Sequence, residues 1–279
     1  MSFGVGNVLA TTVRIWVRNL PRFLLLTVIC YLPILAWFLL LQIDSVNDLA
    51  QRQFYRRLYD LHPVLLSSDA GSATWIFVAV LAAAVATCTV AQLRGERVGI
   101  GRGLATSLRR MPSLVGSAFV VRLATVGVFT AISILRWDET LMGRTSLTWL
   151  VAYQALWATL ASLFVATLPA VVIERRGVVS ALGRSVGLAH GNRIKVLAVV
   201  LVHQALMFGI YVLLYELMMP SPGEDYGDLE RRFQLYAYVR FGVELVFVSL
   251  GAVVAAVVYE RLREAREGPA PGTLDRIFE

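Results

Sequence analysis

The sequence predicts an all-α integral membrane protein with six transmembrane helices, arranged as three pseudo-repeated helical hairpins. Three observations predict this fold class: an apolar fraction of 57% with a mean hydropathy of +0.67, six apolar runs long enough to cross a bilayer, and a basic phrase that recurs ahead of the odd-numbered runs. Soluble domains are less apolar than this. We therefore expect one membrane domain over residues 1–267 and a cytoplasmic tail over 268–279.

The six runs each reach the length of about 20 residues that a helix needs to cross hydrocarbon. The second contains no charged residue and the third contains one, Arg122. The first run is too long for the apolar core of a signal peptide and is not followed by a small-residue cleavage site, so we expect it to be retained. The expected spans are Phe23 to Ile43, Ala73 to Leu93, Ser113 to Leu135, Thr145 to Ile173, Val196 to Met219 and Phe241 to Tyr259.

Basic residues are distributed unequally between the two sides of these spans. Of the 26 lysines and arginines, 17 lie in the N-terminal segment, the second and fourth connections or the C-terminal segment, whereas 8 lie in the other connections. Basic residues in short connections stay in the cytoplasm during insertion. We therefore expect a multi-pass protein of the bacterial inner membrane with both termini in the cytoplasm, whose charge meets anionic headgroups rather than nucleic acid.

One short phrase is written almost identically twice. GVGNVLATTVR, at Gly4 to Arg14, returns as GIGRGLATSLR at Gly99 to Arg109. A weaker third copy, SALGRSVGLAHGNRIK, precedes the fifth span in a register that aligns Ser185 with Thr12. The chain therefore reads as three units, each a basic helix followed by two spans, related by an axis along the membrane normal.

Each copy of the phrase is expected to form a cytoplasmic amphipathic helix in the headgroup plane. In the first copy, apolar positions from Val5 to Trp16 recur at helical spacing, and this face is expected to meet acyl chains while the arginines meet phosphate. The alternative is that the copies are ordinary basic flanks with a coincidental likeness. The residues expected to contact headgroups are Arg14, Arg18, Arg102, Arg109, Arg110, Arg184, Arg193 and Lys195.

The third copy carries an Ala, Arg-Ser, Leu, Gly, Arg pattern on a helix that leads into a span, formed by Ala181, Arg184, Ser185, Leu188, Gly191 and Arg193. Over this stretch the chain resembles bacterial multi-span families grouped with the membrane domain of glycerophosphodiester phosphodiesterases. An aromatic residue commonly follows the glycine in those families, and Asn192 stands there in this chain. The resemblance implies a six-span fold without the soluble phosphodiesterase barrel, for which no long polar stretch remains.

Mitochondrial carriers are a second family built from three two-span repeats. They place a Pro-x-Asp/Glu-x-x-Lys/Arg motif at the end of each odd span. Here Pro33 is followed by Ile-Leu-Ala-Trp, and Pro21 and Pro112 precede their spans. The sequence therefore argues against a carrier.

Polar side chains within a span are functional candidates, because burying them unpaired in hydrocarbon is costly. Arg122 cannot shed its charge, so we expect it to face a water-filled cavity or an interior partner such as Gln204, His203 or Glu244. A purely structural ion pair or carbonyl contact is the alternative. The intramembrane candidates are Arg122, His203, Gln204, Glu216 and Glu244.

The sequence contains no motif that indicates catalysis or a metal site. Its three histidines are far apart, both cysteines lie in expected spans, and it has no phosphate loop, Gly-x-Ser-x-Gly or His-Glu-x-x-His motif. We therefore expect no catalytic residue, metal or cofactor. The favoured function is a lipid-engaging scaffold or accessory subunit with phospholipids and membrane subunits as partners. The alternative is a transporter of lipid-like or amphipathic molecules with a cavity around Arg122.

Overall fold

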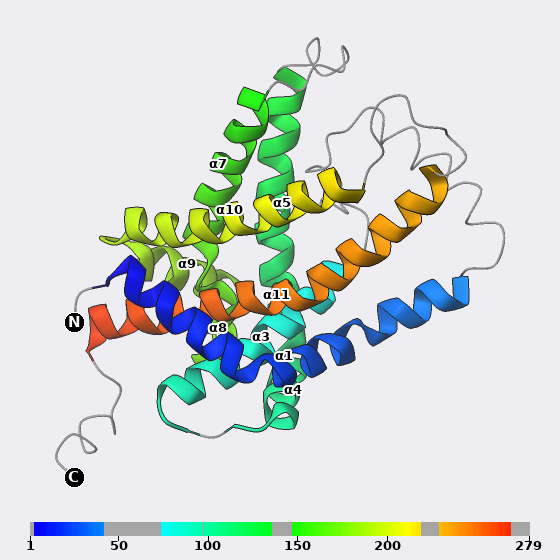
Figure 1. Ribbon diagram of the computed structural model, residues 1–279. Helices are drawn as coiled ribbons and strands as arrows, with labels where there is room; N and C mark the ends of the chain where they lie inside the picture. Colours follow the sequence, from blue (N-terminus) through cyan, green and yellow to red (C-terminus); the bar gives the residue numbers. More distant parts are fainter. Residues whose placement is uncertain (1–2, 42–73, 97, 136–146, 219–228, 269–279) are drawn as a thin grey trace.

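The computed structural model describes residues 3–41, 74–96, 98–135, 147–218 and 229–268, and these residues are almost entirely helical (Figure 1). Five helical stretches are long and apolar enough to cross a bilayer, which fits an all-α membrane protein. They are Val5–Pro33, Trp75–Leu93, Ala155–Ile173, Arg193–Met218 and Val239–Glu267. In chain order the helices are α1 (Val5–Leu41), α3 (Thr74–Leu93), α4 (Ile100–Arg109), α5 (Met111–Leu135), α7 (Leu147–Phe164), α8 (Thr167–Ile173), α9 (Val178–Ala189), α10 (Arg193–Met218) and α11 (Leu229–Glu267).

The expected third span differs from the others. Its helix, α5, has the expected length, but its apolar stretch covers only Met111–Thr125 among the residues whose side chains are described. In Figure 1, α5 and α7 run across the direction of α10 and α11. α5 buries Leu114 and Ser117 in its first half, and then exposes Phe119 and Leu123. A sixth span and three parallel hairpins therefore stay predictions.

The core lies where α1, α3, α8 and α11 pack together. Small and β-branched side chains fill it, which lets helix backbones approach closely and gain dispersion energy in a membrane environment. α10 is the least buried of the five candidate spans. Fully buried core residues include Ala83, Ala84 and Val85 of α3, Ala170 and Val171 of α8, and Val253, Ala256 and Val257 of α11.

Pro169 explains why the fourth apolar run is divided into α7 and α8. A proline inside a helix lacks the N–H that would bond the carbonyl four residues earlier, here that of Val165, and its ring crowds that carbonyl. Ser185 of α9 occupies the break. The Ala166 N–H donates to Ser185 Oγ at 3.2 Å, and Ser185 Oγ donates to the Leu163 carbonyl at 2.8 Å. These two hydrogen bonds attach α9, which contains the third basic phrase, to the connection between α7 and α8.

The first basic phrase is not a separate helix, which corrects the expectation of an amphipathic helix set apart from each hairpin. α1 continues from Val5 to Leu41 through Pro21 and Pro33, and Figure 1 shows it changing direction along its length. Interior prolines bend a helix without always ending it. The second and third phrases do form separate helices, α4 and α9, ahead of α5 and α10.

All three phrases bury the same helical positions. In the register of the sequence alignment, Gly4, Gly99 and Gly177 stand at the first position, and each helix begins at the second. The first two phrases agree in burial class at all eleven positions, and the third agrees with them over the first nine. The fifth and ninth positions, one helical turn apart, are buried throughout: Val8 and Thr12, Gly103 and Ser107, Ala181 and Ser185.

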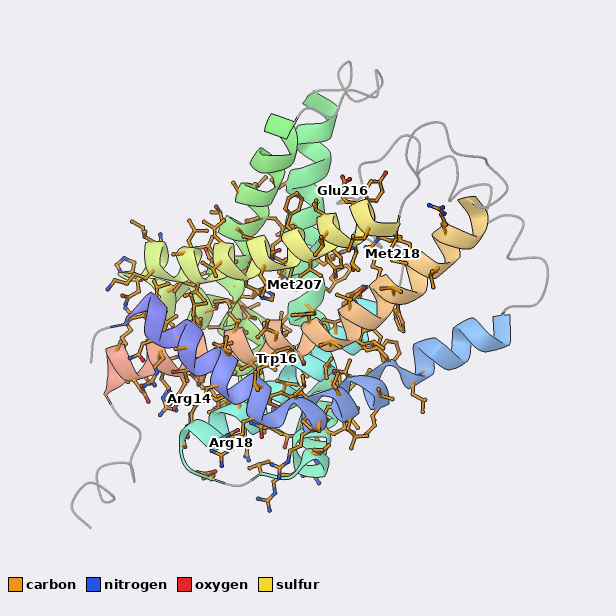
Figure 2. The ribbon with its side chains drawn as sticks, viewed as in Figure 1. Arg14, Trp16, Arg18, Met207, Glu216 and Met218 are labelled. Atoms are coloured by element: carbon orange, nitrogen blue, oxygen red, sulfur yellow. The ribbon has the colours of Figure 1, made fainter. Side chains whose placement is uncertain are left out.

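The buried face of the first phrase packs on protein rather than on acyl chains. α1 makes its most extensive packing with α11. There Trp16, labelled in Figure 2, stacks on Phe247 with ring centroids 5.6 Å apart, and its Nε1 donates to Ser249 Oγ at 3.0 Å. The expectation that this face meets lipid is therefore wrong, because another helix of the chain covers it.

The second phrase, α4, also packs on protein: its Gly103 lies close to α3. A Cβ built on Gly103 would lie 2.9 Å from Cys88 Sγ and 3.2 Å from the carbonyl oxygen of Ala84. Only a residue without a side chain fits this contact without displacing the two helices. Gly101, on the same helix, would meet nothing within 4 Å.

We therefore expect Gly103→Val to destabilise the protein by about 1–3 kcal/mol, the usual cost of overpacking. The matched variant Gly101→Ala should unfold at or slightly above the wild-type temperature, because alanine favours a helix more than glycine does. Thermal unfolding in detergent measures both. Wild-type stability of Gly103→Val would contradict the close packing of α4 on α3.

Candidate functional site

A network of charged side chains joins the ends of α3, α8, α9 and α11. Glu174, directly after α8, accepts hydrogen bonds from Arg176 Nε at 2.5 Å, from Arg184 Nε at 2.9 Å and from Tyr259 Oη at 2.9 Å. Arg184 of α9 also donates to Glu267, near the end of α11. These bonds hold α8, α9 and α11 at one end of the molecule.

The second half of this network centres on Glu260, whose side chain is 2% exposed. Its two oxygens accept hydrogen bonds from Nε and Nη2 of Arg94, each at 2.9 Å, in the paired geometry that makes Arg–carboxylate contacts strong. Arg263 Nη2 lies 3.8 Å from the same carboxylate. Arg94 follows the last residue of α3, so this pair fixes the end of α3 against α11.

Sequence spacing along α11 explains how one helix serves both halves of the network. Glu260, Arg263 and Glu267 recur at intervals of three and four residues, so they share one face of the helix. Arg263 Nε lies 4.0 Å from Glu267 and thus links the two carboxylates. Tyr259, one position before Glu260, is fully buried with its hydroxyl directed at Glu174.

Electrostatics favours the charged form of the groups in this network that lie outside the spans. Burial raises the pKa of Glu174, but hydrogen bonds from Arg176, Arg184 and Tyr259 outweigh it and lower the pKa below its ordinary value. Burial likewise lowers the pKa of Arg184, and its bonds to Glu174 and Glu267 more than compensate. The hydrogen bond to Glu260 raises the pKa of Arg94. We call these residues, Arg94, Glu174, Arg184, Tyr259, Glu260 and Glu267, the charged network.

The contacts of the charged network are those of a structural network of ion pairs that holds helices together. Each of its carboxylates accepts hydrogen bonds from arginine, so within the network none is left as an acid or base for a substrate. Among the residues that the structure describes, no three histidine, cysteine or acidic side chains gather to hold a metal ion.

A second arrangement lies on the exposed side of the basic phrases. Val17, 58% exposed, stands beside Arg18, and Leu108, 52% exposed, stands beside Arg109. Ile194, 84% exposed, lies between two exposed cations at the start of α10. Figure 2 shows Arg14 and Arg18 on the same stretch of α1 as Trp16. We call the exposed cations Arg14, Arg18, Arg102, Arg109, Arg193 and Lys195 the cationic surface; within the described part of the chain none forms an ion pair.

Two of the expected headgroup residues stand apart from the cationic surface. Arg184 is 18% exposed and engaged by Glu174 and Glu267, so its guanidinium belongs to the charged network. Arg110 is half-buried at the boundary between α4 and α5.

The structure does not join Arg122 to the partners expected for it. Arg122 is half-buried on α5 and forms no hydrogen bond or ion pair within the described residues. Its neighbours Phe119, Val120 and Leu123 are exposed. α5 packs on α3, α7, α8 and α9, whereas His203, Gln204 and Glu244 lie on α10 and α11.

The other intramembrane candidates are dispersed along α10 and α11. His203 faces α11, where its Nε2 would lie 3.2 Å from a Cβ on Gly251, and its Nδ1 is buried without a partner among the described residues. Gln204 is half-buried beside it, and Glu216 is exposed near the far end of α10. Glu244 lies on α11, close enough to Tyr31 and Tyr211 to interact electrostatically with both.

Comparison of the chain with models of known protein families, with curated proteins and with solved structures finds no match. The resemblance to the membrane domain of glycerophosphodiester phosphodiesterases therefore stays an expectation. The geometry alone carries the functional argument.

Sequence reasoning missed the acidic half of the charged network. Glu174 and Glu260 directly follow the fourth and sixth expected spans, on the side where basic residues predominate. An acidic residue at such a position indicates an ion pair, because it stands near several arginines on the side of the spans where basic residues predominate. Which arginine it pairs with depends on contacts such as Arg94–Glu260, which join residues 166 positions apart.

Glu174→Gln tests the charged network through its pH dependence. Because the pKa of Glu174 is lower in the folded protein than its ordinary value of 4.5, ionised Glu174 contributes stability that is present above about pH 4.5 and is lost as the pH falls through the folded value. At pH 7 we expect the variant to be less stable by about 2 kcal/mol, the size of hydrogen bonds to a charged group.

The difference between wild type and Glu174→Gln should shrink as the pH falls below 4.5, measured by thermal unfolding across a pH series. Glu264→Gln is the control, because its pair with Arg261 is more exposed and exposed pairs contribute little. Equal stability of Glu174→Gln and wild type at pH 7 would rule out a stabilising network.

Proposed function

We propose that this protein is a non-enzymatic membrane scaffold or accessory subunit that binds phospholipid headgroups through its basic phrases. One observation carries this proposal. At each phrase, or directly after it, an exposed cation adjoins an exposed large apolar side chain, and the cation lacks an acidic partner within the described residues. A cation beside an apolar side chain fits the boundary between phosphate groups and acyl chains.

The opposite face of each phrase supports this function by fixing the cations in place. Thr12, Ser107 and Ser185 are buried against the protein, so the phrases are not free arms. Each exposed cation near an anionic surface contributes about 1 kcal/mol of attraction, and a rigid helix loses little conformational freedom when it binds. The phrases therefore present preorganised positions to lipid.

The shared burial of the three phrases supports their common origin as a repeated unit. A coincidental likeness of basic flanks gives no reason for the same two positions to be buried in each copy. On this proposal the chain has three hairpin units, α5 provides the sixth span, and each phrase serves as the entry to its unit.

The surroundings of Arg122 favour a scaffold over a transporter. An arginine that lines a transport cavity requires polar neighbours or an acidic partner, whereas Phe119, Val120 and Leu123 beside Arg122 are exposed apolar side chains and no described residue pairs with it. Such a surface suits contact with another membrane subunit that supplies an acceptor.

Lipid binding is tested with delipidated protein in detergent. Phosphatidylglycerol should raise the unfolding temperature of the wild type, because lipid that binds the folded state stabilises it. Replacing Arg14, Arg18 and Arg109 together by glutamine should weaken the binding at these two phrases about fivefold for each arginine removed, at about 1 kcal/mol per residue. Arg240→Gln, at a position stacked over Tyr211, is the control and should keep the response. An unchanged response in the triple variant would refute the cationic surface as the lipid site.

The proposed orientation places both termini and the basic phrases in the cytoplasm of a bacterial cell, on the positive-inside rule. Ser180 is exposed on α9 and suits a labelling test. In a variant without Cys30 and Cys88, a cysteine at Ser180 should react with an impermeant thiol reagent only after the cells are broken. Labelling in intact cells would reverse the orientation.

A further inference from the structure

We infer that the third basic phrase holds its own headgroup-phosphate site and that Arg266, on α11, supplies the guanidinium that the phrase lacks at its eleventh position. This inference rests on the proposed lipid-binding function and assigns an additional residue to it.

The eleventh position of the phrase is arginine in two copies and glycine in the third. Arg14 and Arg109 occupy it in the first and second copies, and both are exposed without an ion pair among the described residues. Gly187 occupies it in α9. If the three phrases present equivalent sites, the third therefore lacks its cation at this position.

Arg266 of α11 brings a guanidinium close to this position. A Cβ built on Gly187 would lie 4.0 Å from Arg266 Nη1. In the first two copies the side chains of Arg14 and Arg109 are attached at the helix position equivalent to Gly187. The charge is thus provided by a neighbouring helix instead of by the phrase.

The charge of Arg266 is available to a ligand. Arg261 pairs with Glu264, and Arg263 lies near Glu260 and Glu267. Arg266 is exposed, and within the described part of the chain it forms no hydrogen bond or ion pair. This stretch of α11 therefore engages two arginines internally and leaves the third open.

The charged network holds Arg266 in place. Glu267, the next residue, accepts a hydrogen bond from Arg184, which lies one helical turn before Gly187 on α9. The end of α11 is thereby fastened beside the end of α9. Ile194, flanked by Arg193 and Lys195, follows α9 after a short connection and is 84% exposed. An apolar side chain that could contact an acyl chain therefore lies seven residues after Gly187 in the sequence.

The ligand is the phosphate of a phospholipid headgroup. An exposed guanidinium binds a phosphate oxygen pair well, and the exposed Ile194 between Arg193 and Lys195 favours a ligand that carries an acyl chain over a free anion. Inorganic phosphate is the competing source, and the experiment separates the two.

The test uses charge relocation in the full-length protein. Arg266→Gln should weaken the binding of phosphatidylglycerol about fivefold, measured by lipid-induced stabilisation of delipidated protein in detergent. Adding Gly187→Arg to that variant should restore the binding, because a side chain at Gly187 finds space at ordinary contact distance once Arg266 is shortened. Val179→Arg, which adds the same charge at the other end of α9, is the matched control and should not restore it.

Each outcome decides the inference. Wild-type binding in Arg266→Gln, failure of Gly187→Arg to restore it, or equal restoration by Val179→Arg would overturn the site. Inorganic phosphate at equal ionic strength should stabilise the protein much less than the lipid; equal stabilisation would assign the site to a free anion. If the Arg14, Arg18 and Arg109 variant loses lipid binding while Arg266→Gln does not, the third site fails and the proposed function stands. If neither loses it, both fail.

Discussion

The pairing of Glu260 with Arg94 is the interaction on which the rest of the arrangement depends. The Glu260 carboxylate is almost completely buried, so its desolvation must be offset by the two hydrogen bonds from Arg94. Removing one partner of a buried pair leaves the other charge uncompensated at a cost of about 3–5 kcal/mol. The pair therefore fixes the position of the end of α3 along α11. Tyr259 and Glu267 of α11 fix α8 and α9 in the same way, through their hydrogen bonds with Glu174 and Arg184.

This constraint decides how the basic phrases can function. Because α9 is held by Arg184 and Ser185, and α4 is held by the close contact at Gly103, each of these helices has one face committed to the protein. Only the opposite face is left for the lipid contact that we propose. The cations and apolar side chains on that face consequently have fixed positions, so the proposed headgroup binding would involve the packed core and not a flexible flank.

The sequence predicts the helical class and most of the spans, because these follow from local hydrophobic periodicity. It does not predict what covers a buried face. The spacing from Val5 to Trp16 is equally compatible with acyl chains and with α11, and only the tertiary structure distinguishes them. The role of Arg184 is missed for a related reason, since its partner Glu267 is 83 residues away in the sequence. Pro21 does not separate the first phrase from its span, because one missing hydrogen bond bends α1 without ending it.

The charged network also bears on the choice between a scaffold and a transporter. Alternating access requires one repeat or bundle to rock against another around a central site. In this chain such a movement would separate Arg94 from Glu260 or Arg184 from Glu174, because these pairs join the end of α3 to α11 and α9 to the end of α8. Between them lies a core of alanine and valine at close approach, where sliding would open cavities and lose dispersion contacts. Bonds that oppose relative movement at one end of the helices, together with a tightly packed centre, suit a protein whose function is to hold a single arrangement in the membrane.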